Sequence, residues 1–334
     1  MKKIVAILTI ALFFCVACTY NTKDDKFDKI ENSNIEILEK IDADSFSCRK
    51  IVYVNKNNFA FFCELLNENP ELIQNFLNLG GKLVVSPEED MLQKIESKLQ
   101  LPVQGETCNG ENYEHRFVIL CEENQIVSIR QVLVENSIGY KDEDIIRIAI
   151  SQLNEEENWE PIITTIPEYV GSKGYVYIGK EWLILNVRQD IYTIQDNMEI
   201  DTYFAITNIS IETAGNSIEM GCGLETTTSS MSYVDAEPQR IADKETQGIK
   251  LMAGLEAISW KQSFEGMYID TKHMPHGKCW DIKHNNEKMN LKMGVIWSCP
   301  MEKEKVSFCS TMRIIMDNKE QVIQDEFSYE MCGE

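Results

Sequence analysis

The sequence predicts an α+β protein, in which a mixed α/β N-terminal part is followed by a mostly antiparallel β C-terminal part. Between residues 51 and 153, short β-rich runs alternate with segments whose apolar residues recur at helical spacing. From about residue 160, the runs are short, rich in β-branched and aromatic residues, and bounded by Gly, Asp and Asn, as antiparallel strands are. We therefore expect a mixed α/β domain over residues 34–160 and a β-rich domain over residues 161–334.

Asparagine, proline and glycine mark the helix ends of the first part. Asn58 and Asn69 precede apolar stripes at helical spacing, where an asparagine side chain can cap the first turn. Pro70 suits a first helical position, and Gly80-Gly81 suits a left-handed helix end. The expected elements are a strand over Ile51–Val54, helices over Phe59–Leu66 and Pro70–Leu77, a strand over Leu83–Val85, a helix from the capping box Ser86–Glu89 to Leu99, a hairpin of Phe117–Cys121 and Ile126–Val134, and a helix from Asp142 to Leu153.

The second part is expected to be built from strands joined by polar turns. Thr226–Ser230 is expected to be an exposed loop, and Ile241–Leu255 allows a helix that Gly248 and Gly254 disfavour. The expected strands are Ile162–Ile166, Tyr175–Ile178, Trp182–Val187, Ile191–Ile194, Thr202–Thr213, Met293–Ser298, Val306–Met316 and Gln321–Tyr329.

The first eighteen residues have the organisation of an export signal. Met1-Lys2-Lys3 is basic, Ile4–Phe14 is apolar except for Thr9, and the composition turns polar after Cys18. Val16-Ala17-Cys18 resembles the lipobox of bacterial lipoproteins. The resemblance implies that a signal peptide over residues 1–17 is removed and that Cys18 carries the lipid anchor, palmitate included. It also implies a cell-envelope location, at the outer membrane if the organism has one, on a periplasmic or surface face.

Two other readings of this segment remain open. Cleavage after Ala17 by an ordinary signal peptidase fits the small residues at 15 and 17. An uncleaved anchor is the third reading, although Ile4–Ala17 is shorter than the roughly 20 residues that span a bilayer. Residues 18–33 are polar and without an apolar period, which predicts a flexible tether behind the lipidated cysteine.

The charge of the chain restricts its partners. It has 54 acidic and 32 basic residues, a formal net charge of −22. Such a surface repels nucleic acid and anionic lipid headgroups. We therefore expect attachment to a membrane through the lipid anchor, an unknown protein or glycan partner, and no nucleic acid.

Nine cysteines follow Cys18, an odd number, so at least one is free or pairs outside the chain. Export permits disulfides, and we expect two or more, with short separations that suit local pairs. The alternative is a set of buried thiols that act as small apolar side chains. The candidate pairs are Cys48–Cys63, Cys108–Cys121 and Cys299–Cys309.

One segment concentrates side chains that bind metals. His273, His276, Cys279 and His284 lie within twelve residues, and imidazole and thiolate are ligands that zinc and copper favour. Pro275 and Gly277 exclude a regular helix, so the segment would have to curl around an ion as a loop. The ligands are contiguous rather than paired on separate elements, and Cys279 has possible disulfide partners. We therefore favour no metal site and expect solvated histidines on a surface loop.

Motifs of common enzymes are missing. The sequence has no Gly-x-Ser-x-Gly elbow and no dinucleotide or phosphate loop, so we expect no cofactor and assign no catalytic residue. His115 precedes Cys121 by six residues, but a structural histidine is the commoner explanation. We predict a non-catalytic binding or assembly module. The alternatives are a metal-binding protein or metalloenzyme that uses the His273–His284 segment, and an envelope enzyme that acts on glycans.

Overall fold

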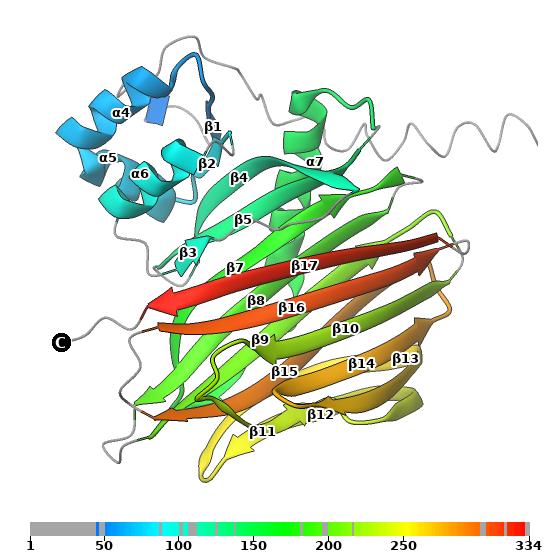
Figure 1. Ribbon diagram of the computed structural model, residues 1–334. Coiled ribbons are helices and arrows are strands. Elements are labelled where there is room, and N and C mark those ends of the chain that lie inside the picture. Colours follow the sequence, from blue (N-terminus) through cyan, green and yellow to red (C-terminus); the bar gives the residue numbers. More distant parts are fainter. Residues whose placement is uncertain are drawn as a thin grey trace, which may run out of the picture.

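The computed structural model describes residues 45–46, 51–86, 89–99, 103–105, 112–123, 126–136, 138–180, 183–195, 200–215, 217–300, 305–316 and 319–330. The expected signal peptide, Cys18 and the tether lie outside these residues. In the described part, the chain is mostly β-strand and is arranged in two large sheets, with helices gathered at the N-terminal side (Figure 1). This is broadly compatible with the expected α+β class, although the β content is greater than an even mixture.

The first sheet has nine strands in the order β1-β2-β4-β5-β7-β8-β9-β15-β11. Only β1–β2 and β5–β7 pair in parallel, and the other neighbours are antiparallel. The strands are β1 Ile51–Val54, β2 Lys82–Val85, β4 Tyr113–Glu123, β5 Ile126–Glu135, β7 Glu168–Ile178, β8 Ile184–Gln195, β9 Ile200–Glu212, β15 Lys288–Pro300 and β11 Ser232–Glu237.

The second sheet has eight strands, in the order β12-β13-β14-β10-β16-β17-β3, with β6 paired to β13. All its pairings are antiparallel. The strands are β12 Ile241–Ala253, β13 Glu256–Met274, β14 Gly277–His284, β10 Ile218–Thr226, β16 Lys305–Met316, β17 Lys319–Glu330, β3 Val103–Gly105 and β6 Ile163–Thr165.

The nine-stranded sheet continues through the expected domain boundary. β5 belongs to the expected first part and β7 to the second, yet they pair in parallel from Ile129–Lys173 to Val134–Ile178. The two-domain division at residue 160 stays a prediction about folding units. In the described residues, one sheet joins the two parts.

The helices with assigned bounds in the described residues are α4 Phe59–Glu68, α5 Pro70–Asn78, α6 Glu89–Leu99 and α7 Asp142–Glu155, which runs into the short helix η1 Glu156–Asn158. The first three pack on one face of β1, β2, β4 and β5 through one apolar cluster, and α7 packs on the opposite face through another. We call the second surface the α7 face.

The two expected asparagine caps behave differently. Asn69 Oδ1 accepts from the Leu72 amide at 3.2 Å, as predicted for a cap of α5. Asn58 makes no side-chain cap on α4. Its side chain turns back into the preceding strand, where Nδ2 donates to the Tyr53 carbonyl and Oδ1 accepts from the Asn55 amide. The cap at Asn58 was wrong because burial offered this side chain partners behind the helix instead of in its first turn.

The end of α5 follows the prediction closely. Gly80 has φ +84°, in the left-handed region that glycine tolerates best. The Gly80 amide donates to the Leu77 carbonyl and the Gly81 amide to the Phe76 carbonyl, each at 2.9 Å. This pair of bonds is the Schellman motif, which satisfies two otherwise unpaired carbonyls at the helix end.

Two stretches of the second part differ from the helix that the sequence allowed and from the strands that it predicted. Ile241–Leu255 is not a helix: its residues form β12, and Gly254 at φ +66° turns the chain into β13. The two strands expected at Trp182–Val187 and Ile191–Ile194 are one strand, β8, because the polar residues between them stay in register with β7 and β9.

The eight-stranded sheet packs on the face opposite α7, forming a β-sandwich core that includes Trp280, Trp297 and Met312. The first half of β13 also reaches the α7 face. A side chain at Gly294 of β15 would collide with Leu251 of β12 and with Ile206 of β9, and would lie 3.4 Å from Trp260 of β13. Gly294 shares the α7 face with Lys292, two residues before it in the same strand. The α7 face is therefore covered by α7 at one end and by the β12–β13 hairpin at the other.

Candidate binding site

The structure spreads out the four candidate metal ligands. They lie on a β-hairpin rather than the expected surface loop: His273 is near the end of β13, His276 is in the turn, and Cys279 and His284 are on β14. His273 pairs with Lys278 and His284 with Met267, so these two histidines are separated by about 20 Å along the hairpin. In the residues that the structure describes, no group of three or more His, Cys, Asp or Glu side chains is placed to hold a metal ion.

The individual environments of these residues also differ. His284 is buried, and its ring nitrogens lie 3.2 Å from the Gly266 carbonyl and 3.1 Å from the Lys288 carbonyl. His273 contacts Tyr233 edge to face at 5.8 Å between ring centroids. Cys279 is a half-buried thiol, and burial raises its pKa. His284 therefore acts in packing, contrary to the expectation of a solvated histidine.

The pair of His115 and Cys121 is not formed. Both are on β4, but an irregularity between His115 and Phe117 changes the register with β5. His115 lies opposite Leu133 and Cys121 opposite Ser128, which are on different faces of the sheet. The two side chains cannot share a proton across the sheet.

Six cysteines lie in the described part, and no disulfide joins any two of them: Cys63, Cys121, Cys222, Cys279, Cys299 and Cys309. Of the three candidate disulfides, only Cys299–Cys309 has both members described, and it is not formed. The two thiols belong to β15 and β16, in different sheets. Cys48, Cys108 and Cys332 lie outside the described residues, so the expectation of disulfides involving them stays a prediction.

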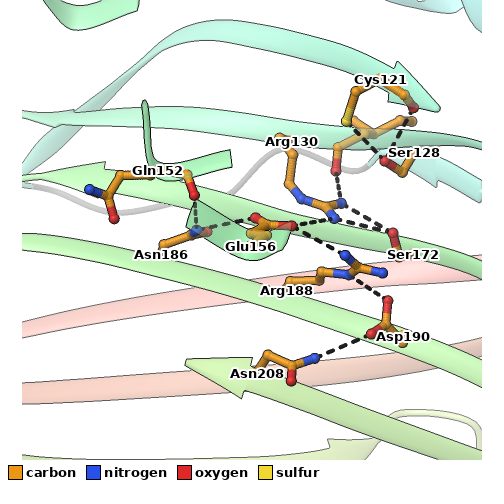
Figure 2. Close-up of polar contacts among 11 residues, drawn as sticks. Cys121, Ser128, Arg130, Gln152, Glu156, Ser172, Asn186, Arg188, Asp190 and Asn208 are labelled. Atoms are coloured by element: carbon orange, nitrogen blue, oxygen red, sulfur yellow. Dashed lines mark hydrogen bonds and ion pairs between the residues drawn. The ribbon is translucent and has the colours of Figure 1, made fainter. Parts of the chain in front are cut away.

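A row of buried polar side chains crosses the α7 face, and Figure 2 shows its centre. Glu156, where α7 meets η1, accepts from Arg130 of β5 and from Arg188 of β8, both at 3.4 Å to Oε2. Asn186 donates to its other oxygen at 3.1 Å. Because Arg130 and Glu156 are almost completely buried and Arg188 is only 16 % exposed, the carboxylate compensates charge that water reaches little or not at all.

The row continues toward the far end of the face. Arg188 donates to Asp190 at 2.7 Å, and Asn208 of β9 donates to the other Asp190 oxygen at 3.2 Å. Asn208 lies opposite Lys292 of β15, which is 5 % exposed and whose ammonium donates to the Glu160 carbonyl. Burial lowers the pKa of Lys292 to about 8, with Arg188 adding to the effect and Asp190 and Glu160 opposing it.

A cavity of about 670 Å³ opens beside this end of the row. Its walls come from the segment after α7, from the bend of β13 at Gly266, where φ is +71°, and from β15 with the turn before it. At the cavity wall, the Gln262 side chain of β13 pairs with the backbone of β15. It donates to the Asn290 carbonyl and accepts from the Lys292 amide, both at 3.0 Å. The lining includes Asn158, Trp159, Glu160, Asn208, Gln262, Ser263, Glu265, His284, Asn285, Asn286, Lys288, Asn290 and Lys292.

The lining is suited to binding a polar ligand. Carboxamides from several elements offer both donors and acceptors, Trp159 offers an aromatic surface, and the buried Lys292 and Asn208 lie at the inner side. This is the combination of a concave site with a few fixed polar groups that small-molecule sites use.

One feature of the sequence indicates the buried network beside this site, although the search for local motifs does not detect it. Arg130, Arg188 and Asp190 are charged residues inside or between β-rich runs, at positions that alternate with apolar neighbours. A charged residue on a strand covered on both faces must be paired. That signal points to a buried network, but it names no partners, since Glu156 and Lys292 come from elsewhere in the chain.

In the described residues, no helix has the length and apolar character needed to cross a bilayer.

No family model matches the chain, and the comparison with curated proteins finds no match. Solved structures give weak likenesses. The delta-toxin of Clostridium perfringens has 9% identity and a TM-score of 0.33, with 68% of this chain and 92% of the toxin covered. The membrane-inserted form of the NetB toxin of the same organism has 10% identity and a TM-score of 0.25, with 52% and 92% covered. A cohesin module of its family 33 glycoside hydrolase has 10% identity and a TM-score of 0.24, with 39% and 84% covered. TM-scores this low carry no argument about function.

Proposed function

We propose that this chain is an exported bacterial envelope lipoprotein, lipidated at Cys18, whose β-rich body is a non-catalytic binding module. The observation that carries the proposal is the cavity between η1 and the bend of β13, with Asn208 and Lys292 at its inner side. Strand pairing and the Glu156 network hold these groups in place before any ligand arrives, which lowers the entropy cost of binding.

The charge and the signal segment support the location and the kind of partner. The acidic surface disfavours nucleic acid and anionic headgroups, so membrane attachment falls to the acyl chains at Cys18. A flexible tether over residues 18–33 would keep the body near the membrane, within about 50 Å. A module held in this way binds ligands at the envelope and has no need of a catalytic group.

The binding test asks whether the cavity holds any ligand. Protein purified from its native envelope is analysed by native mass spectrometry beside Ser263→Trp, which fills the cavity from an exposed position on β13. Ser232→Trp on β11 is the matched control, because it adds the same side chain outside the lining. We expect an adduct on the wild type and the control that the Ser263→Trp variant lacks. Its absence from all three would overturn the binding role.

The anchor is tested separately. Cys18→Ser should leave the precursor unprocessed and move the protein out of the detergent phase, while Cys15→Ser should still be lipidated. A Cys18→Ser protein that partitions into detergent at the mature size would show that the lipobox reading is wrong.

A further inference from the structure

The inner side of the cavity carries a buried acceptor to which no described residue donates a hydrogen bond. Asn208 is 4 % exposed, and its Nδ2 donates a hydrogen bond to Asp190 Oδ2 at 3.2 Å. Its Oδ1 is buried and has no hydrogen-bond partner in the described part of the chain. A buried carbonyl oxygen left in this way destabilises the fold unless something in the cavity donates to it. Asn208 therefore points to a ligand that carries a donor.

A donor lies beside that acceptor. Lys292 pairs with Asn208 across β9 and β15, so the two side chains leave neighbouring positions on the same face. An ammonium has three N–H donors, and the Glu160 carbonyl takes one of them. A ligand at this place meets an acceptor and a donor side by side. Adjacent hydroxyl groups, each of which donates and accepts, match that arrangement.

The rest of the lining favours an uncharged ligand with a flat apolar side. Trp159 is half-buried at the wall, where an indole ring can pack against the C–H face of a sugar. Lys288 is already paired with Glu155 at 3.0 Å. Glu160 and Glu265 also line the cavity, so an anionic ligand would be repelled while Lys292 alone attracts it.

We infer that the cavity binds a neutral saccharide, with neighbouring hydroxyls of one ring on Asn208 Oδ1 and Lys292 Nζ and the ring face against Trp159. This inference rests on the proposed binding function and names its ligand class. It assigns Asn208 and Lys292 as binding residues and no catalytic role to either.

The test is calorimetric titration of the full mature chain with four probes: maltotriose, cellotriose, the trimer of N-acetylglucosamine, and the acidic trimer of galacturonic acid. We expect saturable binding of at least one neutral probe and none of the acidic one. Asn208→Leu, Lys292→Met and Trp159→Ala should each weaken binding at least tenfold. Asn75→Leu on α5 and Lys272→Met on β13 are matched controls outside the lining and should leave affinity unchanged.

The outcomes separate this inference from the proposed function. Circular dichroism and thermal unfolding identify variants that have lost the fold, and Trp159→Ala keeps the test decisive if the two buried substitutions unfold the chain. If a neutral probe binds Trp159→Ala, and those of Asn208→Leu and Lys292→Met that keep the fold, as tightly as it binds the wild type, the assigned site is wrong. If no neutral probe binds but the adduct lost in Ser263→Trp is acidic or apolar, the saccharide is wrong and the binding module stands. If no probe binds and no adduct is found, both fail.

Discussion

The α7 face of the nine-stranded sheet has two halves that are covered in different ways. Under α7, the sheet presents Val132, Val134 and Val176, which pack against Ile146 and Ala149 of the helix in a dry cluster. Beyond η1, the same face presents the polar row from Arg130 to Lys292. β5 belongs to both halves, with Val132 and Val134 under α7 and Arg130 in the polar row, and the other strands of the two halves differ.

The apolar half and the polar half of the α7 face have different physical requirements. An apolar half can be sealed by any helix with a matching stripe, and its stability is proportional to the area removed from water. A polar half must pair each buried group, and among the described residues of the row the side-chain carbonyl oxygens of Asn186 and Asn208 have no hydrogen-bond partner, the second of them beside the cavity. The first half holds the fold together, and the second positions a site.

The largest expected effect breaks the polar half. Glu156→Gln removes the charge that compensates the buried Arg130 and, together with Asp190, the mostly buried Arg188. We expect a loss of about 5 kcal/mol in the free energy of unfolding, at the upper end for breaking a buried ion pair, because two cations lose one partner. The measurement is urea unfolding at pH 7.

The neighbouring residue is the control for that change. Glu155 pairs with Lys288 on the surface, where both side chains are more than two-fifths exposed. Glu155→Gln should cost less than about 1 kcal/mol. Equal losses for the two variants would contradict the role assigned to Glu156.

A slightly smaller effect is expected from the apolar half. Phe117→Ala removes a ring that is 2 % exposed and lies edge to face with Tyr53 at 5.6 Å between centroids. The cavity left behind should cost about 4 kcal/mol. Phe61→Ala on α4, where the ring is 41 % exposed, is the matched control and should cost about 1 kcal/mol or less. Urea unfolding of both variants gives the comparison.

The smallest expected effect is the pH dependence that Lys292 gives to the free energy of unfolding. Burial lowers the pKa of Lys292 from 10.5 to about 8, so between those values the unfolded chain binds more protons than the folded one. The free energy of unfolding should therefore rise with pH across this window, by about 3 kcal/mol relative to Lys292→Met. Subtracting the free energies of unfolding of Lys292→Met, measured over the same pH series, removes the contributions of the other titrating groups. Parallel curves for the two proteins would show that Lys292 is solvated.

Much of the local structure was readable from the sequence, and the failures have a common cause. The end of α5 follows from Asn69 and Gly80-Gly81 because those residues act on backbone groups within a few positions. Asn58 has the same local pattern as Asn69 and fails as a cap, because it is buried against Tyr53. The sequence predicts two strands in place of β8, because Arg188 and Asp190 resemble the polar residues of a turn. In the structure they stay within the strand, where Glu156 pairs with Arg188 and Asn208 with Asp190.

Composition and neighbours a few residues apart predict most strands of the nine-stranded sheet, the two ends of α5, the mostly β character of the second half, and the acidic charge. The spread of the four candidate metal ligands along a hairpin and the pairing of Asn208 with Lys292 depend on contacts between distant parts of the chain. Lys292 reaches the Glu160 carbonyl across 132 residues of chain. Such contacts are set by strand register and by which segment covers which face, and no local pattern encodes either.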